Sequence, residues 1–219
     1  MPTFIEHNIP KINQINSETG RKYSTPEGKY YPSVTTVLSF QEKPELIAWR
    51  KRVGDAEANR ISRIASTKGS KVHLACENYL EGKETEWGIA ESDAREAFQA
   101  FIPVLEKVTT VHAMETRMWS DKLEVAGTVD LIAEVDGELT ILDWKTSSRY
   151  KRKEDIPDYF KQMATYSVMF YERTGVAIPN MTIQMTVPEI GLLTFKEKVK
   201  DWVPEFIKVR KAFKEARGY

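Results

Sequence analysis

Two aspartates lie inside runs of apolar residues that otherwise resemble buried β-strands. Asp130 and Asp143 flank the dipeptide Asp136-Gly137. An Asp-Gly pair between two strand-like runs is a strong signal for a two-residue type I′ turn. Such a turn pairs Val135 with Glu138, and continuing the count along both strands predicts that Asp130 lies directly opposite Asp143.

This predicted pairing brings two like charges together. Asp130 and Asp143 would form a non-hydrogen-bonded pair with Cα atoms about 4.5 Å apart, and like charges in that position destabilise a sheet. Lys145, on the same face, supplies part of the neutralising charge, and a hard divalent ion does so better because Mg²⁺ and Mn²⁺ prefer carboxylate and water oxygens. A neighbouring lysine can stabilise charge on a pentavalent phosphate. The pattern predicts a metal site for phosphodiester hydrolysis. The alternative is a charged cluster on a solvated sheet face, and one bulge would break the register.

Four motifs in order carry a family resemblance. Asp130 followed by Asp143-Trp144-Lys145 resembles the Asp…(Asp/Glu)-x-Lys pattern of the PD-(D/E)XK nuclease superfamily. The run Gln162-Met-Ala-Thr-Tyr166 is similar to the Gln-x-x-x-Tyr motif of its RecB-like branch, and His73 in GSKVHLACENYL is similar to the upstream histidine of that branch. The runs ETRMWSDKLEVAGTVDLIAEVDGELTILDWKTS and YPSVTTVL resemble the mitochondrial genome maintenance exonucleases and related phage and bacterial exonucleases.

The resemblance implies an α/β fold, in which helices flank a mixed central β-sheet, and it implies roles for individual residues. Asp130 and Asp143 would be catalytic and would bind Mg²⁺, for which Mn²⁺ would substitute. His73 and the Trp144 carbonyl would be further metal ligands. Lys145 would position the attacking water or neutralise the transition state. Gln162 and Tyr166 would help hold DNA or support the site. Apart from the resemblance, the basic run that follows Lys145 predicts phosphate contacts or a solvated face, and the residues expected to contact DNA there are Thr146, Ser147, Arg149, Lys151 and Arg152.

The activity implied is that of an Mg²⁺-dependent DNA exonuclease in recombination, repair or replication. Its partner would be DNA that is single-stranded or has a free end. The chain has no nucleotide-binding P-loop, so a helicase partner would be a separate chain, and a single-strand annealing protein is another expected partner. The alternatives are a structure-specific endonuclease or nickase of the same superfamily, and a non-catalytic DNA-binding module. The single cysteine excludes the subgroup with a four-cysteine iron–sulfur cluster.

Two acidic residues have open roles. Glu77 follows His73 by four residues, so on a helix it shares the same face and either accepts the imidazole N–H or remains a solvated glutamate. Glu115, in the strand before the hairpin, either approaches the metal or forms a salt bridge at the edge of the core. His7 and His112 have no motif support.

The elements that must position these residues form one expected domain over residues 1–219. Residues 1–32 are expected to be an irregular or hairpin lead-in, residues 33–108 a helical part, and residues 109–219 a sheet core with flanking helices. The expected helices are 53–66, 69–81, 89–107, 158–172 and 200–216, and the expected strands are 111–119, 123–135, 138–146, 181–187 and 191–196.

Composition supports an intracellular setting. The 219 residues include 32 basic and 32 acidic side chains, so overall charge indicates no polyanionic partner. No apolar run approaches the ~20 residues of a membrane span, and MPTFIEHNIPKINQ lacks a signal-peptide core. We expect a cytoplasmic protein of a bacterial cell or a phage-infected host, with no membrane partner.

Overall fold

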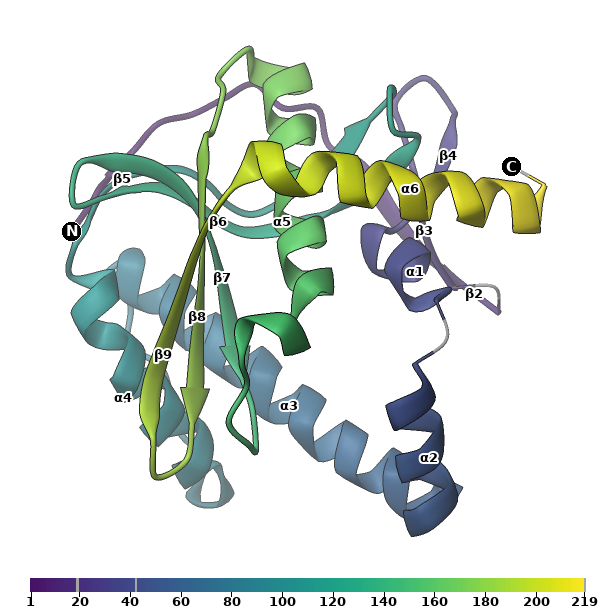
Figure 1. Ribbon diagram of the computed structural model, residues 1–219. Coiled ribbons are helices and arrows are strands. Elements are labelled where there is room, and N and C mark those ends of the chain that lie inside the picture. Colours follow the sequence, from purple (N-terminus) through teal and green to yellow (C-terminus); the bar gives the residue numbers. More distant parts are fainter. Residues whose placement is uncertain (19, 42, 219) are drawn as a thin grey trace.

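The computed structural model describes residues 1–18, 20–41 and 43–218. Its centre is a six-stranded sheet in the order β1-β5-β6-β7-β8-β9 (Figure 1). β1 with β5 and β7 with β8 are parallel, and the other neighbours are antiparallel. The sheet is therefore mixed, as predicted. The strands are β1 (Thr3–Phe4), β5 (Val108–Ser120), β6 (Val125–Val135), β7 (Glu138–Thr146), β8 (Asn180–Val187) and β9 (Gly191–Lys198).

Helices cover both faces of this sheet. One core cluster joins α3 and α4 to the sheet, and a second joins α1, α5 and α6 to the opposite face. No helix within the described residues is long and apolar enough to cross a membrane. The helices are α1 (Val34–Ser39), α2 (Pro44–Val53), α3 (Asp55–Leu80), α4 (Ser92–Leu105), α5 (Pro157–Thr174) and α6 (Val199–Arg217), with short 3₁₀ turns at Ile89–Glu91 and Lys153–Asp155.

The turn between β6 and β7 has the predicted conformation. Asp136 and Gly137 both have positive φ, 51° and 80°. Two consecutive positive φ angles are what a type I′ turn requires. Val135 pairs with Glu138 across the turn, so the predicted register is confirmed.

The β6–β7 ladder nevertheless ends earlier than predicted. It runs as far as the pair Leu131–Leu142, one position short of the predicted pairing of Asp130 with Asp143. The Trp144 N–H donates instead to Asp130 Oδ2, at 3.2 Å. The two aspartates are thus near the end of the ladder and are not a paired step of it.

Residues 1–32 are more ordered than the expected lead-in. They contain a three-stranded antiparallel sheet of β2 (Asn13–Ser17), β3 (Gly20–Ser24) and β4 (Tyr30–Pro32). Tyr23 and Tyr31 of this sheet pack in a small core with Trp119 of β5 and Ala126 of β6. The N-terminal sheet is therefore attached to β5 and to β6, the strand that carries Asp130.

One long helix replaces two expected helices. The predicted break between residues 66 and 69 is wrong, because α3 continues through Gly69 for 26 residues. A glycine inside a helix costs only about 1 kcal/mol relative to alanine, which is too little to end a helix whose second half is packed. The first half of α3 extends away from the sheet together with α2 (Figure 1).

Candidate active site

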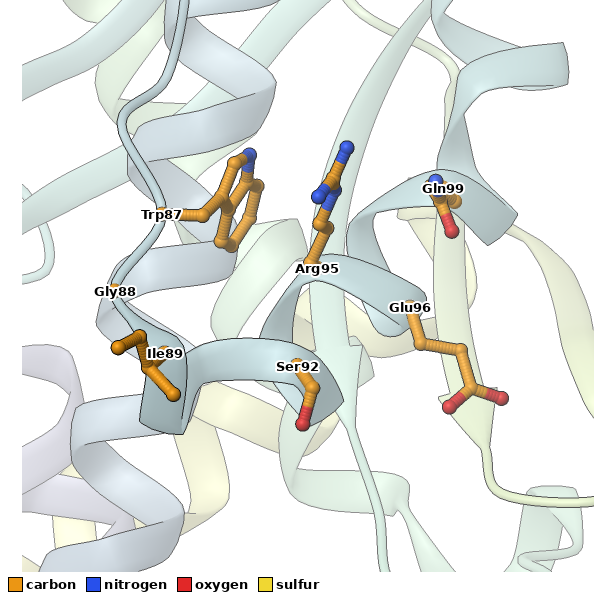
Figure 2. A pocket seen from close by; sticks show the side chains of 7 residues that line it. All are labelled: Trp87, Gly88, Ile89, Ser92, Arg95, Glu96 and Gln99. Atoms are coloured by element: carbon orange, nitrogen blue, oxygen red, sulfur yellow. The ribbon is translucent and has the colours of Figure 1, made fainter.

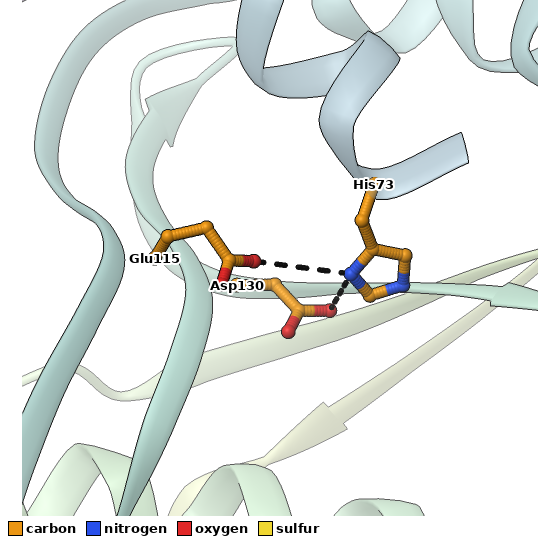
Figure 3. Close-up of side chains that lie close together, drawn as sticks. All are labelled: His73, Glu115 and Asp130. Atoms are coloured by element: carbon orange, nitrogen blue, oxygen red, sulfur yellow. Dashed lines mark ion pairs between the residues drawn. The ribbon is translucent and has the colours of Figure 1, made fainter. Parts of the chain in front are cut away.

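Three side chains from different elements converge beside the end of the β6–β7 ladder. They are His73 of α3, Glu115 of β5 and Asp130 of β6, and one ligand atom of each lies within 4.8 Å of the others. The Nδ1 atom of His73 is 3.4 Å from Asp130 Oδ2 and 3.9 Å from Glu115 Oε1 (Figure 3). An imidazole nitrogen and two carboxylates at this spacing can hold one divalent ion.

A local distortion of two strands makes this convergence. Glu115 and Asp130 occupy opposite positions between two regular pairs of β5 and β6. Glu115 has φ 44°, a left-handed conformation that is uncommon for a residue other than glycine. Val129 and Leu131, on either side of Asp130, pack in opposite core clusters, so the alternation of side chains breaks at this aspartate. Such strain is characteristic of functional sites.

Hydrogen bonds to the Trp144 backbone fix the orientation of the site. His73 Nε2 lies 2.7 Å from the Trp144 carbonyl oxygen, so this nitrogen donates and Nδ1 faces the carboxylates. The Trp144 carbonyl is an acceptor for His73 here, and its role as a metal ligand stays a prediction. The suggestion that Glu77 accepts the imidazole N–H is wrong, because Trp144 and the two carboxylates engage both ring nitrogens.

Asp143 and Lys145 form a second, more buried part of the site. Asp143 is only 2% exposed, and its Oδ2 forms an ion pair with Lys145. Lys145 Nζ is the cationic partner of this oxygen, and it also lies 4.9 Å from the ring centre of Tyr159. A carboxylate buried in this way requires a cation beside it, and Lys145 supplies one.

A cavity of about 550 Å³ joins these groups. His73, Asp130 and Lys145 line it together with Gln162 and Tyr166 of α5. Gln162 Nε2 donates to Tyr166 OH at 2.9 Å. The structure therefore brings four of the sequence motifs to one cavity. Further lining residues are Gln14, Arg21, Tyr23, Ser33, Thr35, Glu77, Glu115, Arg117, Gly127 and Thr128.

The other residues predicted to contact DNA do not line this cavity. Thr146 ends β7 and pairs with β8. Ser147 donates its hydroxyl to the Arg149 carbonyl at 2.7 Å, which shapes the connection after the strand. Arg152 lies 3.8 Å from Asp155, and Lys151 belongs to the same connection. The contacts of these five residues with DNA stay predictions.

A second hollow, of about 460 Å³, lies beside α4 and the segment before it (Figure 2). Trp87, Ile89, Arg95 and Glu96 are among its lining residues. It contains none of the motif residues. The cavity at His73 is therefore the candidate active site.

Comparison with known proteins agrees with this geometry. Residues 41–201 match the family model described as the PD-(D/E)XK nuclease superfamily. The chain belongs to this superfamily.

Curated relatives of this nuclease include mitochondrial genome maintenance exonuclease 1 of Mus musculus, 30% identical over 129 residues, and of Homo sapiens, 30% identical over 132 residues. Each match covers 55% of this chain and 38% of the relative. The solved structure of SSO0001 aligns with a TM-score of 0.42 and 12% identity, over 82% of this chain and 72% of that chain. That structural likeness is too distant to carry an argument about function.

Burial and neighbouring charges shift the protonation of the nuclease site. Burial alone lowers the pKa of His73, but Asp130 and Glu115 outweigh it and raise this pKa to about 9. Burial and the Glu115 carboxylate raise the pKa of Glu77 to about 7. Burial raises the pKa of Asp143 to about 6, with Lys145 opposing and Asp130 adding to the shift. The site therefore holds more protons at neutral pH than isolated side chains would.

We expect divalent ion binding to tighten as pH rises. Below pH 9 the free His73 imidazole is mostly protonated, and a metal ion must displace that proton from Nδ1. The affinity for Mn²⁺ should increase by about tenfold per pH unit between pH 7 and pH 9. Titration of Mn²⁺ by electron paramagnetic resonance measures this slope. The control variant His7→Asn, outside the site, should show the same slope. An Mn²⁺ affinity that does not change with pH in the wild-type protein would argue against a metal ion bound to His73.

Gly127 is required by the close approach of Tyr166. A Cβ atom at Gly127 would lie 2.6 Å from Tyr166 Cε1 and 3.0 Å from its hydroxyl. Gly127→Ala should therefore displace the buried tyrosine, cost about 1–3 kcal/mol of stability and break its bond to Gln162. Gly69→Ala is the matched control, because its Cβ meets nothing within 4 Å, and it should stabilise α3. Urea unfolding of both variants measures the difference, and equal stabilities would contradict this packing.

Proposed function

We propose that this nuclease is a divalent-metal-dependent exonuclease that hydrolyses phosphodiester bonds from DNA ends. The observation that carries the proposal is the convergence of the His73–Glu115–Asp130 trio at a cavity that Lys145, the ion-pair partner of Asp143, also lines. A family match alone would not require these side chains to meet, so their proximity is independent support for catalysis.

The residues fit an oxygen-preferring ion such as Mg²⁺ or Mn²⁺. Asp130, Glu115 and Asp143 offer carboxylate oxygens, and His73 offers Nδ1. We retain Asp143 and the Trp144 carbonyl as proposed ligands and add Glu115 to the set. A bound divalent ion would acidify a water molecule and neutralise charge on the phosphorane.

Lys145 acts as a cation and not as a base in this proposal. Burial lowers the pKa of Lys145, but Asp143 and Asp130 outweigh it and the net shift is upward. The ammonium group therefore stays charged at neutral pH. A permanently charged donor is suited to orienting the attacking water and to stabilising the developing negative charge. Tyr166, whose pKa burial raises, likewise stays protonated and supports Gln162.

The substrate and setting are also proposals. The printed names of the curated relatives support an exonuclease, and we propose DNA that is single-stranded or has a free end as the substrate. The biological process would be recombination, repair or replication in a bacterial cell or a phage-infected host. A helicase or a single-strand annealing protein would then present the DNA end.

A digestion series tests the proposed function. The substrates are single-stranded, duplex and covalently closed circular DNA of one sequence, with the linear forms labelled at either end, each incubated with Mg²⁺ or with EDTA. We expect release of short products from at least one linear form, in Mg²⁺ only, while closed circles stay intact. The catalytic control is Asp143→Asn.

Each other result selects a different function. Cutting of closed circles would replace the exonuclease by an endonuclease or nickase. DNA binding without cleavage of any substrate would indicate a non-catalytic binding module. Cleavage that continues in EDTA would contradict the metal site itself.

A further inference from the structure

The N-terminal sheet forms one wall of the catalytic cavity. Gln14 of β2 and Arg21 and Tyr23 of β3 line it, and Gln14 pairs with Tyr23 across the two strands. The Tyr23 hydroxyl lies 3.3 Å from Thr128 Oγ1 of β6, which ties this wall to the strand that carries Asp130. These N-terminal residues precede the segment 41–201 that matches the superfamily model. The N-terminal sheet thus lies before the matched segment and still contributes residues to the cavity of that segment.

Arg117 brings a second guanidinium to the same wall. It pairs with Thr128 across β5 and β6, next to the Tyr23 hydroxyl contact. Arg117 is two residues beyond Glu115, and both line the cavity. Arg21 lies two residues before Tyr23, so it shares that face of its strand. Both arginines therefore border the cavity from the side where the N-terminal sheet meets β5 and β6.

Neither arginine has a carboxylate partner in the part of the chain that the structure describes. Among the described residues no ion pair or side-chain hydrogen bond involves the guanidinium of Arg21 or Arg117, and both residues are exposed. Two other arginines that contact the loop between β5 and β6 are neutralised, Arg173 by Asp121 at 3.1 Å and Arg210 by Glu124 at 3.2 Å. Of the acidic residues that line the same cavity, Glu115 and Asp130 lie beside His73. Two uncompensated guanidinium groups beside a metal site are suited to an anionic part of the substrate.

We propose that Arg21 and Arg117 form a phosphate-binding wall that holds the nucleic-acid backbone next to the bond being cleaved. A guanidinium presents paired N–H donors that match phosphate oxygens and stays charged at all working pH values. Contacts of this kind position a nucleic acid without reading its sequence. This inference rests on the proposed nuclease function, and it assigns to the N-terminal sheet a role in substrate positioning. An internal phosphodiester and a terminal phosphomonoester offer the same chemistry to the wall.

Binding and kinetic measurements on charge-removing variants test the wall. Arg21→Ala and Arg117→Ala should each weaken binding of a dye-labelled single-stranded oligonucleotide, in EDTA, by about tenfold. Each should also reduce the slope of log K against log salt by about 1. In Mg²⁺ the KM for cleavage should rise more than kcat falls. Arg21→Lys and Arg117→Lys should restore part of the affinity, because they keep charge but lose the paired donors.

Controls separate this inference from the proposed function. Arg95→Ala removes an exposed arginine of α4 and should change neither affinity nor salt slope. Oligonucleotides that end in a phosphate or in a hydroxyl distinguish a terminal phosphate from an internal one. If the alanine variants lose affinity only for the phosphate-ended oligonucleotide, the wall binds a terminal phosphate. If they lose affinity equally for both, it binds an internal phosphodiester. Wild-type affinity, salt slope and KM in both alanine variants would overturn the wall while cleavage still supports the nuclease. A wild-type protein that neither binds nor cleaves DNA would overturn the proposed function, and the wall with it.

Discussion

Replacing Lys145 by methionine is expected to lower kcat for DNA cleavage by about 10²–10³-fold, the usual cost of removing one donor that stabilises developing negative charge. Methionine keeps the length and apolar stem of lysine but has no charge. The variant leaves the His73–Glu115–Asp130 trio intact, so Mn²⁺ affinity should not weaken. Single-turnover cleavage at saturating Mg²⁺ together with Mn²⁺ titration separates these two effects.

The matched control for this variant is Lys161→Met. Lys161 is also largely buried and forms an ion pair, with Asp158 at 3.3 Å, but it does not line the cavity. It should retain cleavage activity. A Lys145→Met enzyme with kcat near the wild-type value, or one that loses metal and activity together, would contradict the assigned role.

Replacing Asp130 by asparagine is expected to remove metal binding and cleavage together. Asparagine can still accept the Trp144 N–H bond, so the change removes charge with little change of shape. The loss of Mn²⁺ affinity should exceed the about 10–100-fold that results from mutating a residue that only hydrogen-bonds to a metal ligand. Isothermal titration calorimetry and cleavage of end-labelled DNA measure the two losses.

A second readout of Asp130→Asn does not depend on activity. Asp130 is the main neighbour that raises the pKa of His73 to about 9, so this pKa should fall in the variant. Nuclear magnetic resonance titration of the His73 ring measures the fall. Glu134→Gln, on the same strand but outside the cavity, is the control and should leave the His73 pKa unchanged. An unchanged His73 pKa in Asp130→Asn would contradict the geometry of the trio.

The part of the site around the β6–β7 turn could be predicted because its signals are local. Asp136-Gly137 specifies its own turn, and the turn sets the register for every pair up to Leu131. The pairing of Asp130 could not be obtained by counting. The strands are distorted at this residue. In a regular strand, side chains two residues apart share one face, but Val129 and Leu131 pack in core clusters on opposite faces.

Glu115 remained ambiguous in the sequence because the turn before β6 has no turn-specific dipeptide. The four residues 121–124 are Asp-Lys-Leu-Glu, so the pairing of β5 with β6 could not be counted from them as it could from Asp136-Gly137. The left-handed φ of Glu115 depends on tertiary structure, and no local pattern of residue types predicts it. The N-terminal sheet was underestimated for a similar reason, because its strands are short and it is stabilised by packing on Trp119 and Ala126.

The helix containing His73 illustrates the opposite case. Two helices, 53–66 and 69–81, were expected where the structure has one, and the second half of α3 packs on the sheet. The face that carries His73 could still be predicted, because buried Cys76 and Leu80 follow it at helical spacing.

The most direct test of the metal centre is a crystal structure of the protein soaked in Mn²⁺, with the ion located by its anomalous scattering. The account predicts one peak bonded to Asp130 and His73, with oxygen atoms of Glu115 or Asp143 completing the protein ligands. A cavity without a peak at saturating Mn²⁺, or an ion held only by residues outside this set, would contradict it.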